Sequence, residues 1–512
     1  MRLQRLTAIS VVLGLAPLAH AHVGSADIYL DGKAGPYQLF VTVRPPLVIP
    51  GVAELEVRSE SPSIKHLRAV AMPLTGAGAK FAPVPDKLVQ STRDAQFFTG
   101  SLWLMAPGSW QVRITATGDK GDGTVAVPVS SAALAIRKMH TLLGGFLSLL
   151  GIFIVAGLVA MAGASVREAR LAPGLAVPPQ NKRKAKFAMA IAVFIVAGAL
   201  WVGHRWWNSE AASYSQQIYK PLVMSPALDR SGVLTLTLSD PGWFRPNRRM
   251  DYRRDLFTRT IDDLVPDHNH LMHLYAIREP GLDVVYHLHP EQTDTGIFRL
   301  TLPNMEPGDY RLYADIVHAT GFPETMLAQM NIPAGLPGRA LTGDDASGHF
   351  VSWTQASSAA RQFKLPDGYV MHWLDDGSSL HAKVAQVYRF ELTDAAGRPA
   401  QDVQLYMGML GHAAFIKTDG TVFAHVHPSG SVSMAALEMA QHGQPAANGA
   451  DMSAMDMSGM NMPGMDHSSA LELLPNKVGF PYGFPTPGRY RIFVQMKHGG
   501  IIETGIFDAS VY

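Results

Sequence analysis

The chain has 512 residues, of which 47% are hydrophobic and only 17% are charged, and it contains no cysteine. This length exceeds what one hydrophobic core usually organises, and a formal net charge of +1 gives no electrostatic reason to expect nucleic acid as a partner. Without cysteine, disulfides and thiolate metal sites are excluded, so any soft metal ion must be held by the 20 histidines and 24 methionines.

The first segment, residues 1–21, is typical of a secretory signal peptide. Arg2 and Arg5 precede a short apolar stretch, and Ala19-His20-Ala21 carries small residues at the positions that a signal peptidase reads. Cleavage after Ala21 makes His22 the first residue, whose α-amine and imidazole can together chelate one copper ion. We therefore predict His22 as a candidate metal ligand; cleavage after Ala19 would instead expose His20.

Residues 22–138 predict an N-terminal β-sandwich. Short β-rich runs such as YQLFVTVRP, AELEVRS and WQVRITATG are separated by glycine and proline turns. The stretch AGPYQLFVTVRPP and the later PGSWQVRI resemble domains of the YtkA and FixH type. That resemblance implies an extracytoplasmic Ig-like module associated with copper handling and oxidase assembly.

Two apolar runs follow and predict transmembrane helices at 139–165 and 187–207. The intervening loop, 166–186, carries six basic residues against the single acid Glu168, so the positive-inside bias places this loop in the cytoplasm. The sequence therefore predicts an inner-membrane protein, anchored in the lipid bilayer, whose other domains face the periplasm or the cell exterior.

The rest of the chain contains one pattern twice, within 225–334 and within 345–512. LMHLYAIREPGLDVVYHLHPE recurs as MLGHAAFIKTDGTVFAHVHPS, and PGDYRLYADIVH recurs as PGRYRIFVQMKH. Both copies are rich in short strands, and a Gly- and Ala-rich linker separates them. We predict a mainly β protein with three Ig-like or cupredoxin-like β-sandwich domains, and with the two transmembrane helices between the first and the second.

Each copy carries four histidines in the same order. An H-x-H on one strand puts two imidazoles on the same face, about 7 Å apart, where a neighbouring strand can supply a third ligand. We therefore predict one metal site per repeat, with the last histidine of each set as an optional fourth ligand. The predicted ligands are His273, His287, His289 and His318 in the first repeat and His412, His425, His427 and His498 in the second.

The second repeat differs from the first by methionines. A shift of 139, which aligns His273 with His412, brings His268 onto Met407 and His270 onto Met409. Thioethers are soft ligands for Cu(I), so Met407 and Met409 are candidate ligands; filling of a hydrophobic core is the equal alternative.

A methionine-rich loop is predicted at 434–467, where small polar residues separate the methionines in DMSAMDMSGMNMPGMDHSS. Such a run has no periodic apolar face to bury. It resembles the methionine-rich copper motifs of bacterial copper-resistance proteins and multicopper oxidases, which implies Cu(I) binding. The candidate ligands are Met452, Met455, Met457, Met460, Met462 and Met465.

Enzyme interpretations fit less well. Gly281, His287 and His289 match the opening of a cupin signature, but Glu291 comes too early for the expected glutamate. The metalloproteases of the JAMM type need a serine and an aspartate where this chain has Ala435 and Glu438. The order of a sandwich, two membrane helices and further sandwiches resembles the B subunit of membrane-bound methane and ammonia monooxygenases. In that family, however, the H-x-H lies in the first domain.

The sequence thus predicts a non-enzymatic, membrane-anchored copper-binding protein for copper tolerance, storage or delivery, with zinc as the alternative metal. Other copper-handling or oxidase proteins are the expected partners. Two alternative functions remain: an assembly factor for a respiratory oxidase, and a scaffolding or adhesive protein whose histidines are structural.

Overall fold

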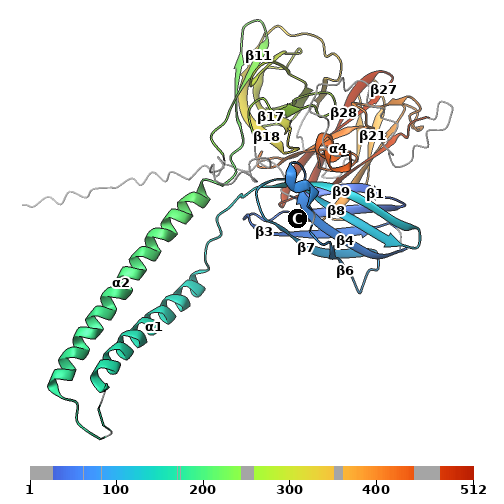
Figure 1. Ribbon diagram of the computed structural model, residues 1–512. Helices are drawn as coiled ribbons and strands as arrows, with labels where there is room; N and C mark the ends of the chain where they lie inside the picture. Colours follow the sequence, from blue (N-terminus) through green and yellow to red (C-terminus); the bar gives the residue numbers. More distant parts are fainter. Residues whose placement is uncertain are drawn as a thin grey trace, which may run out of the picture.

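A computed structural model describes residues 27–60, 63–81, 83–169, 171–172, 174–243, 259–350, 361–442 and 473–512. His22 and the six methionines of the predicted loop lie outside the described residues. The chain folds into three β-sandwiches, with two long helices that project together from the junction of the sandwiches (Figure 1). This confirms the prediction of a mainly β protein with two apolar helices between its first and second β-rich parts.

The first sandwich packs two antiparallel sheets over an aliphatic core that includes Leu55 and Ile114. One sheet has the order β1-β2-β3-β7-β6 and the other the order β5-β4-β8-β9. The strands are β1 (Ile28–Ala34), β2 (Tyr37–Arg44), β3 (Gly51–Ser59), β4 (Ile64–Pro73), β5 (Asp86–Lys87), β6 (Val89–Gln90), β7 (Phe97–Leu104), β8 (Gly108–Gly118) and β9 (Gly121–Ser131), with a short 3₁₀ turn η1 (Ala77–Lys80).

Helices α1 (Thr141–Glu168) and α2 (Pro179–Ser215) are long and apolar enough to cross a membrane. They lie side by side, and Gly163 of α1 leaves room for the side chain of Met189, because a Cβ there would lie 2.7 Å from it. The helix α2 begins within the predicted loop 166–186 and ends beyond the predicted segment 187–207. Proline at its first position and the helix-forming residues of NKRKAK explain this early start.

The second sandwich packs the sheet β10-β11-β16-β15 on the sheet β12-β17-β13-β14-β19, and β18 pairs with β17. The strands are β10 (Val223–Leu228), β11 (Val233–Ser239), β12 (Leu264–Val265), β13 (His273–Glu279), β14 (Val284–Leu288), β15 (Glu291–Asp294), β16 (Ile297–Thr301), β17 (Gly308–His318), β18 (Pro323–Ile332) and β19 (Ala346–His349).

Strand β19 corrects a predicted boundary, because residues 345 onward were assigned to the third sandwich. It instead pairs with β14 of the second. Gly348 makes this fit possible, since a Cβ there would lie 2.7 Å from Thr504 of the third sandwich. The segment expected to be a plain linker is therefore built into the interface of the two repeats.

The third sandwich packs the sheet β20-β21-β22-β26 on the sheet β23-β27-β24-β25, and β28 pairs with β27. Its helix α4 (Met434–His442) occupies the start of the predicted loop 434–467, because Ala435, Leu437 and Met439 have an apolar surface to bury. The strands are β20 (Gln362–Lys364), β21 (Val370–Leu374), β22 (Gln386–Thr393), β23 (Val403–Gln404), β24 (His412–Lys417), β25 (Phe423–Val426), β26 (Lys477–Tyr482), β27 (Gly488–His498) and β28 (Ile501–Val511).

The second and third sandwiches pack face to face. Alternate residues of β13 point in opposite directions, so that Leu274 enters the core of its own sandwich while Tyr275 and Ile277 enter a small core shared with Ile416 and Phe493. Buried Arg491 of β27 extends this contact by donating to the carbonyl of Leu282 at 2.8 Å. Both sheets are thus covered on both faces, which explains their almost continuous apolar sequences.

Candidate metal centre

The histidines of both repeats meet in this interface. His273 continues the outward face of β13, and His287 and His289 continue that of β14; His412 and His425 do the same for β24 and β25. The eight imidazoles that gather between the two sandwiches are His268, His270, His273, His287, His289, His412, His425 and His427. We call this set the imidazole cluster. Histidines predicted for two separate sites therefore lie in one cluster.

Two histidines enter the cluster from a tight turn before β13. His268 and Asn269 both have positive φ, 51° and 69°, while the backbones of Asp267 and His270 bond to each other on either side. These are the features of a type I′ turn, in which asparagine and glycine are favoured at the central positions. The turn brings His268 and His270 back beside His273. The equivalent turn of the second repeat has Met407 and Gly408 at its centre, with φ of 50° and 79°.

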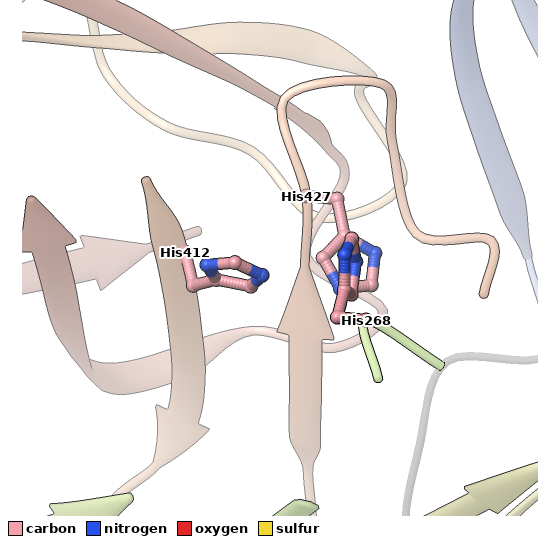
Figure 2. A group of neighbouring side chains, drawn as sticks. All are labelled: His268, His412 and His427. Carbon is pink, nitrogen blue, oxygen red and sulfur yellow. The ribbon is translucent and has the colours of Figure 1, made fainter. Parts of the chain in front are cut away.

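Two groups of three imidazoles are close enough to share an ion each. One group combines both repeats, His268 with His412 and His427 (Figure 2), and the other is His273 with His287 and His289. Within each group the candidate ligand nitrogens all lie within 4.8 Å of one another. His425 lies between the groups, with ring centroids 5.4 Å from His273 and 4.6 Å from His427.

The hydrogen bonds leave two lone pairs facing each other in the second group. His273 Nε2 lies 2.9 Å from the carbonyl oxygen of Asp267, which only accepts, so Nε2 carries the proton and Nδ1 is bare. His287 Nδ1 donates to Gln495 Oε1 at 2.9 Å, so its Nε2 is bare as well. These two bare nitrogens are 3.1 Å apart. Nitrogens that bind one ion at about 2.0–2.1 Å lie about 3.0–3.4 Å from each other, so this separation fits a shared metal ion.

The other imidazoles are oriented in a similar way. Nδ1 of His289 faces Asp345 Oδ1 at 3.2 Å, Nδ1 of His425 faces Asp315 Oδ2 at 3.3 Å, and Nδ1 of His427 donates to the carbonyl of Val432 at 3.0 Å. Their Nε2 atoms are buried and have no hydrogen-bond partner among the described residues. The same holds, within that part of the chain, for Nε2 of His268 and both ring nitrogens of His412. Buried unpaired nitrogens are costly, and an acceptor on the opposite ring nitrogen is the usual support of a metal-binding histidine.

The repeats exchange this support across the interface. Asp315 lies opposite His273 in the β13–β17 ladder, and Gln495 lies opposite His412 in the β24–β27 ladder, so the two positions are equivalent. Gln495 of the third sandwich orients His287 of the second, while Asp315 of the second orients the equivalent His425 of the third. Such reciprocal contacts define an approximate two-fold interface.

Burial keeps the cluster neutral. Burial, followed by the neighbouring imidazoles, holds the pKa of His273, His287, His412 and His425 well below the usual value of 6.5. The pKa of His268 is lowered well below that value in the same way. Neutral imidazole is the form that binds metal, so the cluster is ready to bind at pH 7 without first losing protons.

A cavity connects the cluster with the surface. It has a volume of about 1170 Å³, lies among the three sandwiches and reaches His273, His425 and His427. Its lining also includes Leu134 and Ile218, which lie in the segments leading to α1 and from α2. Five carboxylate residues and only two basic residues line it, which favours the entry of a cation. The carboxylate residues are Asp27, Asp267, Asp315, Glu324 and Asp419, and the basic ones are Lys220 and Arg311.

Two predicted fourth ligands lie elsewhere, which corrects that part of the prediction. His318 and His498 have the strand parity of Ile316 and Met496, whose side chains enter the cores of their own sandwiches. They therefore cannot face the interface. Met407 and Met409 are buried beside the cluster, and the backbone carbonyl of Met407 accepts a hydrogen bond from His268.

Sequence reasoning missed several contributors. His268 and His270 were aligned with Met407 and Met409 but were not predicted as ligands. Their position in the repeated block, close before His273, was the signal that could have identified them. The orienting groups Asp345, Gln495 and Tyr406 had no recognisable motif. Tyr406 donates to the carbonyl of Asp344 at 2.8 Å and lies 3.1 Å from His287 Nδ1.

Comparisons with known proteins add little about function. Residues 230–332 and 364–512, within the second and third sandwiches, match the model of a family described as a domain of unknown function, DUF8832. No curated protein matches the sequence.

The solved structures that resemble the chain do so weakly. An engineered protein is 18% identical with a TM-score of 0.15 over 19% of this chain and 21% of its own. The chain thus spans about a fifth of that protein. A tetra-tandem repeat from a large adhesion protein is 9% identical, with a TM-score of 0.15 over 90% of this chain and 71% of its own. The ICAM-5 D1–D4 ectodomain fragment is 7% identical, with a TM-score of 0.15 over 93% and 77%. TM-scores this low carry no argument about fold or function.

Proposed function

We propose that this is a membrane-anchored copper-binding protein that holds copper between its second and third sandwiches. One observation carries the proposal: buried imidazole nitrogens from both repeats converge without partners among the described residues, while the other ring nitrogens of His289, His425 and His427 face acceptors. A structural histidine pair needs no such arrangement, because its nitrogens would be satisfied by hydrogen bonds. The two groups of three suit two adjacent ions, with His425 able to bind either.

The donor set supports copper. Imidazole suits copper and zinc alike, but copper binds a given nitrogen site more tightly in the divalent series. The carboxylates of Asp315 and Asp345 lie against the outer nitrogens of histidines and leave the inner positions to imidazole. Three-nitrogen groups leave open positions at each ion, which suits uptake and release more than permanent structural binding.

The proposed role is copper tolerance, storage or delivery outside the cytoplasm. The basic residues at the adjoining ends of the two helices, Arg167 of α1 and the run from Lys182 to Lys186 of α2, support a cytoplasmic position for the connection under the positive-inside bias. All three sandwiches would then face the periplasm or the cell exterior. The acidic cavity, which is lined in part by the segments next to α1 and α2, is the proposed route of the ion.

Metal analysis of the full-length protein in detergent tests the proposal. After reconstitution with Cu(I), Cu(II) or Zn(II) and removal of loose metal, we expect at least two copper ions per chain, one for each group of three. Replacing His412 and His427 by alanine should remove at least one of them. The matched control replaces His66 and His381, which are exposed and lie outside the cluster. Substoichiometric metal in the wild type, unchanged by the cluster variant, contradicts the proposal.

Two other functions make different predictions. A scaffolding or adhesive protein would retain only background metal in the same measurement. The compared structures include an adhesion protein and a cell-surface ectodomain fragment, at TM-scores that give this alternative no weight. An assembly factor for a respiratory oxidase would bind copper and also co-purify with an oxidase subunit. A monooxygenase-type activity is not part of the proposal.

A further inference from the structure

Each repeat carries a second arrangement of charged residues, away from the imidazole cluster, at the end of its longest hairpin. The strand registers make the two arrangements equivalent: Leu264 lies opposite His318 as Val403 lies opposite His498. Each histidine therefore has two acidic neighbours at equivalent positions. One is the aspartate just before the short strand β12 or β23 (Asp263 or Asp402), and the other is a glutamate from the following long strand β18 or β28. Those glutamates are Glu324, opposite Ile316, and Glu503, opposite Met496.

In the second sandwich this arrangement is a closed ionic clamp. His318 Nδ1 lies 2.6 Å from Asp263 and its Nε2 lies 3.0 Å from Glu324, so both ring nitrogens are used. Arg259 lies 3.0 Å from the other oxygen of Glu324. Arg259 also pairs with Asp240 at 2.6 Å. Both ring nitrogens of His318 and both oxygens of Glu324 thus already have partners, which leaves no ligand atom for an added ion.

In the third sandwich the same arrangement is open. No lysine or arginine forms an ion pair with the equivalent acids in the described ranges, and a further acid, Asp367, joins them from the turn between β20 and β21. Three carboxylates therefore surround one histidine. His498 Nδ1 donates to Asp402 at 3.4 Å, which turns Nε2 toward Asp367 Oδ2 at 3.3 Å and Glu503 Oε2 at 3.8 Å.

The inner atoms of this arrangement lack hydrogen bonds. His498 is 2% exposed and Glu503 is 7% exposed, yet Nε2 of the first and Oε2 of the second have no hydrogen-bond partner among residues that the structure describes. The carboxylate oxygens and the nitrogen of Asp367, His498 and Glu503 all lie within 4.8 Å of one another. Even a protonated His498 would balance only one of the three carboxylates around it, so the buried, unpaired oxygen of Glu503 calls for a further cation.

We propose that Asp367, His498 and Glu503 bind a divalent metal ion of the zinc or manganese type, separate from the copper of the imidazole cluster. Two carboxylates and one imidazole are harder ligands than a set of imidazoles, so the site disfavours Cu(I). Asp402 acts on the outer nitrogen of His498 and fixes its orientation, as carboxylates commonly do behind metal-binding histidines. Asp367 is exposed, which leaves room for water ligands on that side.

The ion would join the two sheets of the third sandwich. Asp367 comes from the sheet that contains β20 and β21, whereas His498 and Glu503 come from β27 and β28 of the other. Because this sandwich supplies three of the eight imidazoles of the cluster, the ion would stabilise the frame that presents those histidines. The proposal does not depend on copper binding.

Titration of the full-length, metal-free protein in detergent with Zn²⁺ and with Mn²⁺ tests the proposal, after the imidazole cluster has been filled with Cu(I). The wild type should take up one further ion per chain, and Glu503→Gln and Asp367→Asn should each abolish this uptake while leaving copper uptake intact. Asp402→Asn should weaken it by about 10–100-fold. The matched control is Glu54→Gln, an exposed glutamate of β3.

Two results would overturn the proposal: no saturable uptake of either ion beyond the copper, or an equal uptake by wild type, Glu503→Gln and Asp367→Asn. Asp367→Asn separates loss of the site from misfolding, because Asp367 lies in an exposed turn. Failure of the copper proposal would show separately, as loss of copper with this further ion retained.

Discussion

Gln495 is the residue through which the third sandwich orients a histidine of the second, and its replacement tests whether the interface forms the metal centre. Its Oε1 accepts from His287 Nδ1, which leaves His287 Nε2 free to face His273. Leucine removes this acceptor without adding charge. Methionine is avoided because its thioether would itself bind Cu(I).

Loss of a group that orients a metal ligand typically costs 10–100-fold in affinity, or about 1.4–2.7 kcal/mol. The lower end is expected for Gln495→Leu, because the hydroxyl of Tyr406 lies 3.1 Å from the same Nδ1 and remains as an acceptor. We therefore predict that copper affinity falls about tenfold. Competition with a chromophoric chelator of known copper affinity measures this change in the full-length protein.

A double-mutant cycle separates orientation from general damage. If Gln495 acts only through His287, then Gln495→Leu has no further effect on copper affinity once His287 has been replaced by alanine. The control is Gln362→Leu, an exposed glutamine of β20 that does not line the cavity. Copper affinity within about twofold of the wild type in Gln495→Leu, or full additivity with His287→Ala, would refute this account of the interface.

Three further predictions concern stability, each measured by urea unfolding of the metal-free protein in detergent. Seven cluster histidines have lowered pKa values, so just below pH 6.5 the unfolded chain binds more protons than the folded protein does. The free energy of unfolding should therefore fall as the pH drops from about 6.5, and a flat profile would contradict this. Burial lowers the pKa of His318, but Asp263 and Glu324 outweigh burial and raise the pKa overall. His318→Gln should therefore lower the free energy of unfolding by about 3 kcal/mol near pH 6, and by progressively less as the pH rises through that raised pKa. Arg491→Leu should lower the free energy of unfolding by about 3–5 kcal/mol, because Asp508 and the carbonyls of Gly281 and Leu282 lose this guanidinium. The control Arg299→Leu, on the exposed face of β16, should change it little.

Much of the fold follows from patterns that a single sequence displays. The alternation of apolar residues predicts the strands, and the repeated blocks predict two equivalent sandwiches. The same alternation also contains information that was not used. His318 is two residues from Ile316 and four from Ala314, so it belongs to the core face of its strand, whereas His273 shares the face of Tyr275. The position of each histidine in its strand therefore separates the cluster histidines from His318 and His498.

The packing of the second sandwich against the third could not be predicted from the sequence. A strand that is apolar on both faces shows that something covers the second face, but it does not identify the partner. The largest error concerns the stretch between the repeats, which the sequence predicts as a linker. Asp345 lies in this Gly- and Ala-rich stretch and yet orients His289. Such contacts depend on tertiary structure, and no local propensity reports them.

The reciprocal contacts explain why the histidine pattern had to be duplicated to be useful. Within one sandwich the outward face of β13 and β14 offers imidazoles, but the group that orients His287 comes from the other sandwich, and so does the group that orients His425. One repeat alone would expose these histidines to water with free rotation about their side-chain bonds. Packing two repeats face to face buries the imidazoles, lowers their pKa values and fixes which nitrogen of each ring is free. The shared apolar core of Tyr275, Ile416 and Phe493 stabilises the interface through contacts that need no metal, so the centre is formed before an ion arrives. A protein built in this way should bind its second copper ion no more tightly than its first, because no folding step separates the two events and adjacent cations repel each other. Strong positive cooperativity in the copper titration would show instead that the first ion assembles the interface.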